Sequence, residues 1–159
     1  MKPFIPIVAP RFLDLLGHLS PLGVGGIGGI TIFPFVFTRI PLSPLTETHE
    51  GIHILQQVEL ALAGALITVP ISMLFAAPTW LVLLLGVWGF LPFLGYFYIL
   101  YGIFYLYWGW RFRGEWDAAY YMIPFEVEAF NNEEKGLEYL WDRHLFAWTV
   151  PRGGADDRA

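Results

Sequence analysis

The 159-residue chain has no cysteine and few charged residues. The absence of cysteine excludes disulfide bonds and thiolate metal sites, so any bound metal must be held by histidine and carboxylate side chains. Charged residues make up 14% of the chain, against about 25% in an ordinary soluble domain. The net charge is −5 and the acidic residues cluster late in the sequence, so no nucleic-acid partner is expected.

The longest uncharged segment of the sequence covers residues 60–110, which contain no Asp, Glu, Lys, Arg or His. One bilayer crossing needs about 20 apolar residues, and this segment lacks the polar face that a helix of a soluble core would show. The sequence therefore predicts a mainly α-helical integral membrane protein. Its centre is a two-span helical hairpin, with transmembrane spans at about 57–77 and 79–101.

The remaining segments are predicted to form shorter elements of one membrane domain, residues 1–159. Interfacial or cytoplasmic helices are expected at about 115–134 and 137–148. Aromatic and β-branched residues predict a short β segment at about 31–38. The sequence does not decide whether residues 20–38 enter the membrane, since their first part is rich in glycine.

The basic residues predict the orientation of the hairpin. Outside the uncharged run lie Lys2, Arg11, Arg39, Arg111, Arg113 and Arg143. Two crossings place both flanks of the run on one side of the bilayer, and the positive-inside bias makes that side cytoplasmic. We therefore predict a multi-pass protein of the cytoplasmic (inner) membrane, in contact with the lipid bilayer and with both termini in the cytoplasm.

The chemistry of the chain is concentrated in the motif His49-Glu50-Gly51-Ile52-His53. Two histidines four residues apart on a helix share one face, with Cβ atoms about 6 Å apart. Both imidazoles can then reach one zinc ion at about 2.0–2.1 Å. Glu50, beside the first histidine, is placed to take a proton from water in metal-assisted hydrolysis.

A catalytic zinc site needs a third protein ligand, and two carboxylates, Glu126 and Glu128, are candidates. An even number of membrane crossings would return the chain to the side on which His49 and His53 lie. Gln56 and Gln57 follow the motif on the same predicted helix. They either support a ligand or form hydrogen bonds within the helical bundle.

Two stretches carry a resemblance to a known family: His49-Glu-Gly-Ile-His-Ile-Leu-Gln-Gln57 and Pro124-Phe-Glu-Val-Glu-Ala129. Together they resemble the gluzincin-type metallopeptidases, which have a downstream Glu-x-Glu-Ala element. They are more closely similar to small bacterial membrane proteins with His-Glu-x-x-His-x-x-Gln-Gln and a later Phe-Glu-x-Glu-Ala-Tyr. The similarity covers residues from about 30 to 148.

The resemblance implies a His2Glu zinc site with Glu126 as the third ligand, Glu128 as the alternative ligand and Glu50 as the base. It also implies that the membrane is the bacterial inner membrane. The gluzincin element often continues with an aspartate that supports a histidine, where this chain has Phe130. Such support must therefore come from another residue.

Two functions follow as hypotheses. The first is a zinc-dependent membrane hydrolase of metallopeptidase type, acting at the cytoplasmic face of the membrane, with Glu50 activating water. The second is a non-catalytic accessory or structural subunit of a larger membrane protein complex, with a retained or relic metal site. The second hypothesis rests on the small size of the chain, which leaves little sequence outside the predicted spans to select a substrate.

Overall fold

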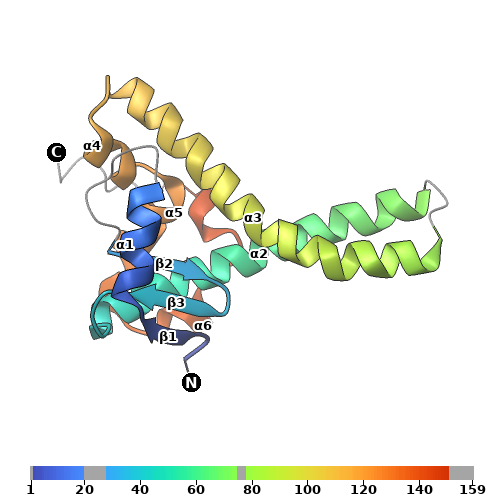
Figure 1. Cartoon of the computed structure of the whole chain (residues 1–159), viewed down its shortest axis with the longest axis horizontal. Helices are drawn as coiled ribbons and strands as arrows, with labels where there is room; N and C mark the ends of the chain where they lie inside the picture. Colours follow the sequence, from blue (N-terminus) through green and yellow to red (C-terminus); the bar gives the residue numbers. More distant parts are fainter. Residues whose placement is uncertain (1, 20–27, 75–77, 151–159) are drawn as a thin grey trace. The chain divides into compact units, whose positions relative to one another are not determined.

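The computed structural model of the chain describes residues 2–19, 28–74 and 78–150 and is mainly helical, with one small sheet (Figure 1). The helices and strands are β1 (Ile5–Val8), α1 (Pro10–Leu19), β2 (Gly29–Ile32), β3 (Phe35–Thr38), α2 (Pro44–Leu74), α3 (Thr79–Arg111), α4 (Trp116–Tyr121), α5 (Pro124–Asn132), η1 (Glu133–Lys135), α6 (Tyr139–Asp142) and η2 (Ala147–Thr149).

The chain divides into two compact units. Unit 1 consists of Met1–Ile54 and Ala129–Arg143, and unit 2 consists of Leu55–Glu128 and His144–Ala159. Two of the three boundaries fall inside α2 and α5, and the third follows α6. Helices α2 and α5 therefore each contribute residues to both units.

Unit 1 is built on a three-stranded sheet in the order β1-β3-β2. The central strand β3 pairs in parallel with β1 and antiparallel with β2, with Gly29 opposite Thr38. Strands are found at 29–32 and 35–38, where the sequence predicts a β segment at about 31–38. The core beside the sheet consists of Phe4, Val36 and Ile54, with Phe33 and Leu42 packed against it.

The start of α2 follows from its first residues. The hydroxyl of Ser43 accepts a hydrogen bond from the backbone N–H of Thr46 at 3.2 Å, which satisfies one of the unpaired donors of the first helical turn. Pro44 is the first helical residue and has no N–H to leave unpaired. These two residues fix where the helix begins, five residues before His49.

Unit 2 has an aromatic core. Its buried residues are Phe97 of α3 with Ile123 and Phe125. The ring of Phe125 packs against Phe97 at 4.8 Å and against Trp148 at 4.7 Å between centroids. The core thus anchors the beginning of α5, the helix that carries Glu126.

Gly109 of α3 lies directly against the indole of Trp116, the first residue of α4. A Cβ atom at position 109 would lie 2.6 Å from Cε3 and 2.8 Å from Cη2 of that ring. We therefore expect Gly109→Ala to lower the free energy of unfolding by about 1–3 kcal/mol, because a rigid indole must move. Thermal unfolding followed by tryptophan fluorescence measures the change.

Gly102, on the same helix, provides the matched control for this variant. A Cβ atom at position 102 would meet no atom within 4 Å. Alanine is favoured over glycine in a helix interior by about 1 kcal/mol, so Gly102→Ala should leave stability equal or higher. Equal unfolding midpoints for the two variants would contradict the packing at Gly109.

The prediction of an integral membrane protein is wrong. Among residues 2–19, 28–74 and 78–150, no helix is long and apolar enough to cross a membrane. This finding corrects the two-span hairpin predicted at about 57–77 and 79–101. It also corrects the predicted multi-pass location in the inner membrane with cytoplasmic termini, which depended on the hairpin.

For α2 the correction has a physical reason. Lack of charge over 60–110 is not sufficient for a crossing, because one helix must itself supply the apolar length. After Glu59, its last charged residue, α2 continues only over 60–74, about 22 Å at 1.5 Å per residue, against roughly 30 Å of hydrocarbon.

The later segments are also more divided than the sequence predicts. The helix expected at about 115–134 is found as α4, α5 and η1, with a break before Pro124. The helix expected at 137–148 is reduced to α6 and η2. Pro124 explains the first break, since the residue before a proline is disfavoured in helical conformation.

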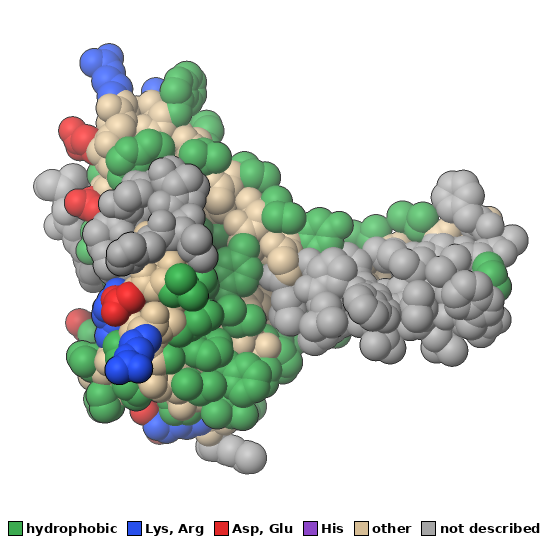
Figure 2. Space-filling model, viewed as in Figure 1, with side chains coloured by type: hydrophobic (Ala, Val, Ile, Leu, Met, Phe, Trp, Pro, Cys, Tyr) green, Lys and Arg blue, Asp and Glu red, His purple; other side chains and the backbone are tan. Residues whose placement is uncertain are grey.

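Hydrophobic side chains are exposed as well as buried. Figure 2 shows apolar side chains over much of one face of the molecule, among few charged ones. The large exposed apolar residues described on α2 and α3 are Leu45, Leu62, Leu66, Ile67, Ile71, Leu74, Tyr96, Ile99, Ile103, Leu106, Tyr107 and Trp110. The hydrophobic residues of the chain are therefore divided between its core and its exposed surface.

Candidate metal site

His49 and His53 lie one turn apart on α2 and are buried, with 8% and 6% of their surfaces exposed. Their Nε2 atoms are 3.2 Å apart, and their rings meet edge to face. Two nitrogens bound to one zinc ion at tetrahedral angles would be about 3.4 Å apart. The spacing of the two Nε2 atoms therefore fits joint binding of one ion.

The other ring nitrogen of His49 is held by a carboxylate. Nδ1 of His49 lies 2.9 Å from Oε2 of Glu133, in η1. An Nδ1–H that donates to this carboxylate leaves Nε2 with its lone pair, which is the form that binds a metal. Phe130 packs edge to face on the same imidazole, at 4.7 Å between centroids.

Glu133 thus supplies the support that the sequence implied but did not locate. Phe130 occupies the position expected for an acid, and its contact with His49 is made by an aromatic ring. The supporting carboxylate comes from Glu133, seven residues after Glu126. Glu133 lies beyond the end of α5, in η1, so helical spacing from Glu126 does not apply to it, and the neighbouring Glu134 offers the same carboxylate.

We expect Glu133→Ala to weaken zinc binding by about 10–100-fold, the range typical of a lost partner of a metal-binding histidine. Isothermal titration of the metal-free protein with zinc measures the change. Glu134→Ala is the matched control, because Glu134 is the exposed neighbour in the same turn. Equal zinc affinity of the Glu133→Ala variant and the control would show that His49 does not depend on this carboxylate.

Glu126 lies in the first turn of α5 and is 2% exposed. Its Oε1 accepts a hydrogen bond of 2.8 Å from the hydroxyl of Tyr101, in α3. Burial, and next the negative charge of Glu126, raise the pKa of Tyr101, so the phenol stays protonated and remains a donor. Tyr101 therefore fixes one oxygen of this carboxylate and with it the orientation of the group.

Glu128 is occupied elsewhere. The side-chain nitrogen of Gln56 donates to Oε2 of Glu128 at 3.0 Å and to the backbone oxygen of Phe125 at 3.1 Å. Gln56 and Glu128 are both buried. Gln56 therefore hydrogen-bonds α2 to α5, and one oxygen of Glu128 accepts one of these hydrogen bonds.

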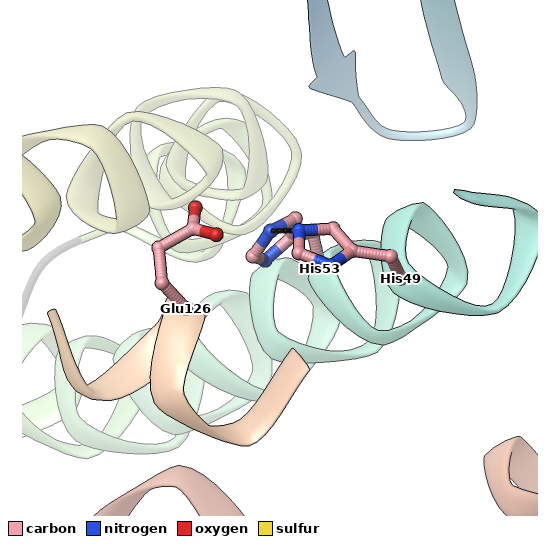
Figure 3. Close-up of side chains that lie close together, drawn as sticks. All are labelled: His49, His53 and Glu126. Atoms are coloured by element: carbon pink, nitrogen blue, oxygen red, sulfur yellow. Dashed lines mark hydrogen bonds between the residues drawn. The ribbon is translucent and has the colours of Figure 1, made fainter. Parts of the chain in front are cut away.

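The ligand atoms of His49, His53 and Glu126 all lie within 4.8 Å of one another. Figure 3 shows the two imidazoles on α2 and the carboxylate on α5 directed toward one another. This buried group of two nitrogens and one carboxylate oxygen could hold a metal ion. Of the two carboxylates that the sequence offered, the structure brings Glu126 and not Glu128 into the group.

Glu50 is held by the sheet of unit 1. Its Oε2 accepts a hydrogen bond from the hydroxyl of Thr31, on β2. The position that a Cβ atom would take at Gly29 lies 3.6 Å from Oε1 of the same carboxylate. The candidate base therefore has one oxygen bonded to the edge strand and the other beside a glycine.

The two middle positions of the motif are packing positions of unit 1. A Cβ atom at Gly51 would lie 2.7 Å from Cδ1 of Leu140 and 3.3 Å from Cε1 of Phe4. Ile52 is fully buried. The motif helix is therefore packed closely against Leu140 and Phe4 at Gly51.

Comparison with known proteins adds no identification. No family model matches the chain, and no curated protein or solved structure was found to match it. The site's own chemistry is the basis for the function proposed below.

Proposed function

We propose that the chain is a zinc-dependent hydrolase, most simply a metallopeptidase of the gluzincin type. The observation that carries the proposal is the buried group of His49, His53 and Glu126, joined on the chain to the adjacent Glu50. Two histidines and one glutamate are the protein ligands of a well-known class of catalytic zinc site, in which further positions stay open for water or substrate.

The donor set favours zinc over other ions. Magnesium and calcium prefer ligands that are all oxygen, whereas imidazole nitrogens suit zinc and its transition-metal neighbours. The chain has no cysteine to complete a closed structural site of the thiolate kind. The 3.2 Å spacing of the two Nε2 atoms supports the same assignment.

In the proposed reaction, zinc supplies Lewis acidity at the scissile carbonyl. Glu50 takes a proton from the attacking water as the water oxygen forms a bond to the carbonyl carbon. The carbon–nitrogen bond then breaks, and the proton passes from Glu50 to the departing amine. The products are a carboxylic acid and an amine, and Glu50 returns to its starting state.

The position of β2 supports a peptide substrate. Among the described strands, β2 is at an edge of the sheet. The N–H of Arg39 donates to the oxygen of Gly28 at 3.4 Å, and pairs in an antiparallel ladder alternate. The backbone groups of Gly29 and Thr31 are therefore expected to point away from β3, where an extended peptide can pair with them.

The test begins with the purified full chain and its metal content. We expect about one zinc per chain by elemental analysis, and hydrolysis of a quenched fluorescent peptide library. Dipicolinate should remove both, and added zinc should restore them. Absence of zinc would reject the site, whereas stoichiometric zinc without any turnover would reject the enzyme and favour the non-catalytic alternative.

A further inference from the structure

The contact between Glu50 and Thr31 joins the motif helix α2 to the edge strand β2. Thr31 is 5% exposed and lies on β2, whereas Glu50 lies on α2, 19 residues later in the chain. A buried threonine in a strand can donate to a backbone carbonyl or accept a structural partner. Here its hydroxyl donates to the one carboxylate to which the proposed function assigns a proton transfer.

We propose that Thr31 is a positioning residue for Glu50, an inference that rests on the proposed hydrolase function. A glutamate side chain can rotate its two oxygens through a broad range of the terminal torsion. The bond from Thr31 to Oε2 removes this freedom. It commits Oε2 to the sheet and leaves Oε1 as the oxygen that exchanges the proton with water.

Gly29 completes the arrangement. It is two residues before Thr31 on β2, so both residues face the same side of the strand. A Cβ atom at position 29 would lie 3.2 Å from the backbone oxygen of Phe37 and, in ordinary van der Waals contact, 3.6 Å from Oε1 of Glu50. Glycine at this position keeps bulk away from Oε1, while Thr31 holds Oε2. The edge strand therefore acts on the two oxygens of Glu50 in different ways.

The direct measure is the binding of acetohydroxamic acid to the zinc-loaded protein, because it needs no known substrate. Acetohydroxamic acid binds zinc as an anion, so a well-oriented carboxylate that accepts its proton strengthens the binding. We expect Thr31→Val, which keeps the shape of the side chain and removes the hydroxyl, to weaken binding about 10-fold. Thr31→Ser, which keeps the hydroxyl, should stay within about 3-fold of the unchanged protein.

The cycle with Glu50→Gln separates this inference from the function on which it rests. In the Glu50→Gln background, Thr31→Val should not weaken acetohydroxamate binding further, because the glutamine that Thr31 still holds cannot accept the proton. Zinc content and thermal unfolding of each variant are measured in parallel, and Thr31→Ala replaces Thr31→Val if the latter does not fold. With a peptide substrate, Thr31→Val should lower kcat about 10–100-fold and leave KM unchanged.

The outcomes are distinct. If Glu50→Gln weakens acetohydroxamate binding and Thr31→Val does not, the positioning role is rejected and the proposed function stands. An equal loss from Thr31→Val in both backgrounds also rejects it, because Thr31 would then act independently of Glu50. If Glu50→Gln itself changes nothing, or the chain binds no zinc, the proposed function and this inference are both rejected.

Discussion

Glu50→Gln is expected to lower kcat for peptide hydrolysis by about 10²–10⁴-fold, the usual contribution of a general base. Glutamine has nearly the same shape, and its side-chain oxygen can still accept the hydrogen bond from Thr31 that the structure shows. What it cannot do is take a proton from water. Zinc content, fold and thermal stability should therefore stay close to those of the unchanged protein.

The control for this variant is Glu47→Gln, on the same helix and three residues earlier. Glu47 pairs with Lys2 at the surface, where an ion pair contributes at most about 1 kcal/mol. Turnover of this variant should be unchanged. Retention of full activity by Glu50→Gln would refute the assignment of Glu50 as the base, and a loss of zinc from it would show a different role.

The second large effect concerns the ligand set. Glu126→Gln should weaken zinc binding by roughly 10²-fold or more, a larger loss than for a residue that only supports a ligand. The variant keeps an oxygen that can accept the hydrogen bond from Tyr101, so the fold around it should be retained. The charge and the metal–carboxylate bond are what is lost, and zinc titration of the metal-free protein measures the difference.

Stability offers an independent measure of the same binding. Free zinc at 1,000 times its Kd should stabilise the unchanged protein by about 4 kcal/mol, because only the folded chain presents the assembled site. The same zinc concentration should raise the unfolding temperature of Glu126→Gln much less. Comparison of the two shifts does not require a substrate.

Glu128→Gln is the matched control, since Glu128 is also buried on α5 but accepts its hydrogen bond from Gln56. We expect it to bind zinc as the unchanged protein does, whatever its effect on stability. If zinc affinity falls with Glu128→Gln and not with Glu126→Gln, the alternative ligand is the correct one, and the arrangement in Figure 3 does not describe the metal-bound site.

The local part of the candidate site could be predicted from the sequence. A separation of four residues places His49 and His53 on one face of any helix, and Pro44 is typical of a helix start. The choice of Glu126 over Glu128 came from the resemblance to gluzincins. It did not come from the expected return of the chain across a membrane, because the described helices provide no such crossing.

The rest depends on contacts between distant segments, which spacing does not encode. Glu133 supports His49 from a short 3-10 turn, 84 residues away in sequence. Thr31 reaches Glu50 from a strand whose pairing with β3 sets which side its hydroxyl faces. Long-range pairing of this kind is fixed by packing and strand register, so neither partner could be read from the chain alone.

The close contact at Gly51 limits which sequences can carry this site. A Cβ atom there would overlap the end of the Leu140 side chain, so a larger residue at position 51 needs either a shift of Leu140 or a smaller residue at position 140. Homologous chains should therefore show paired exchanges at these two positions: glycine with leucine, or alanine with a shorter apolar residue. A search pattern that leaves the third position of His-Glu-x-x-His unrestricted discards this link between the motif and the C-terminal part of the chain.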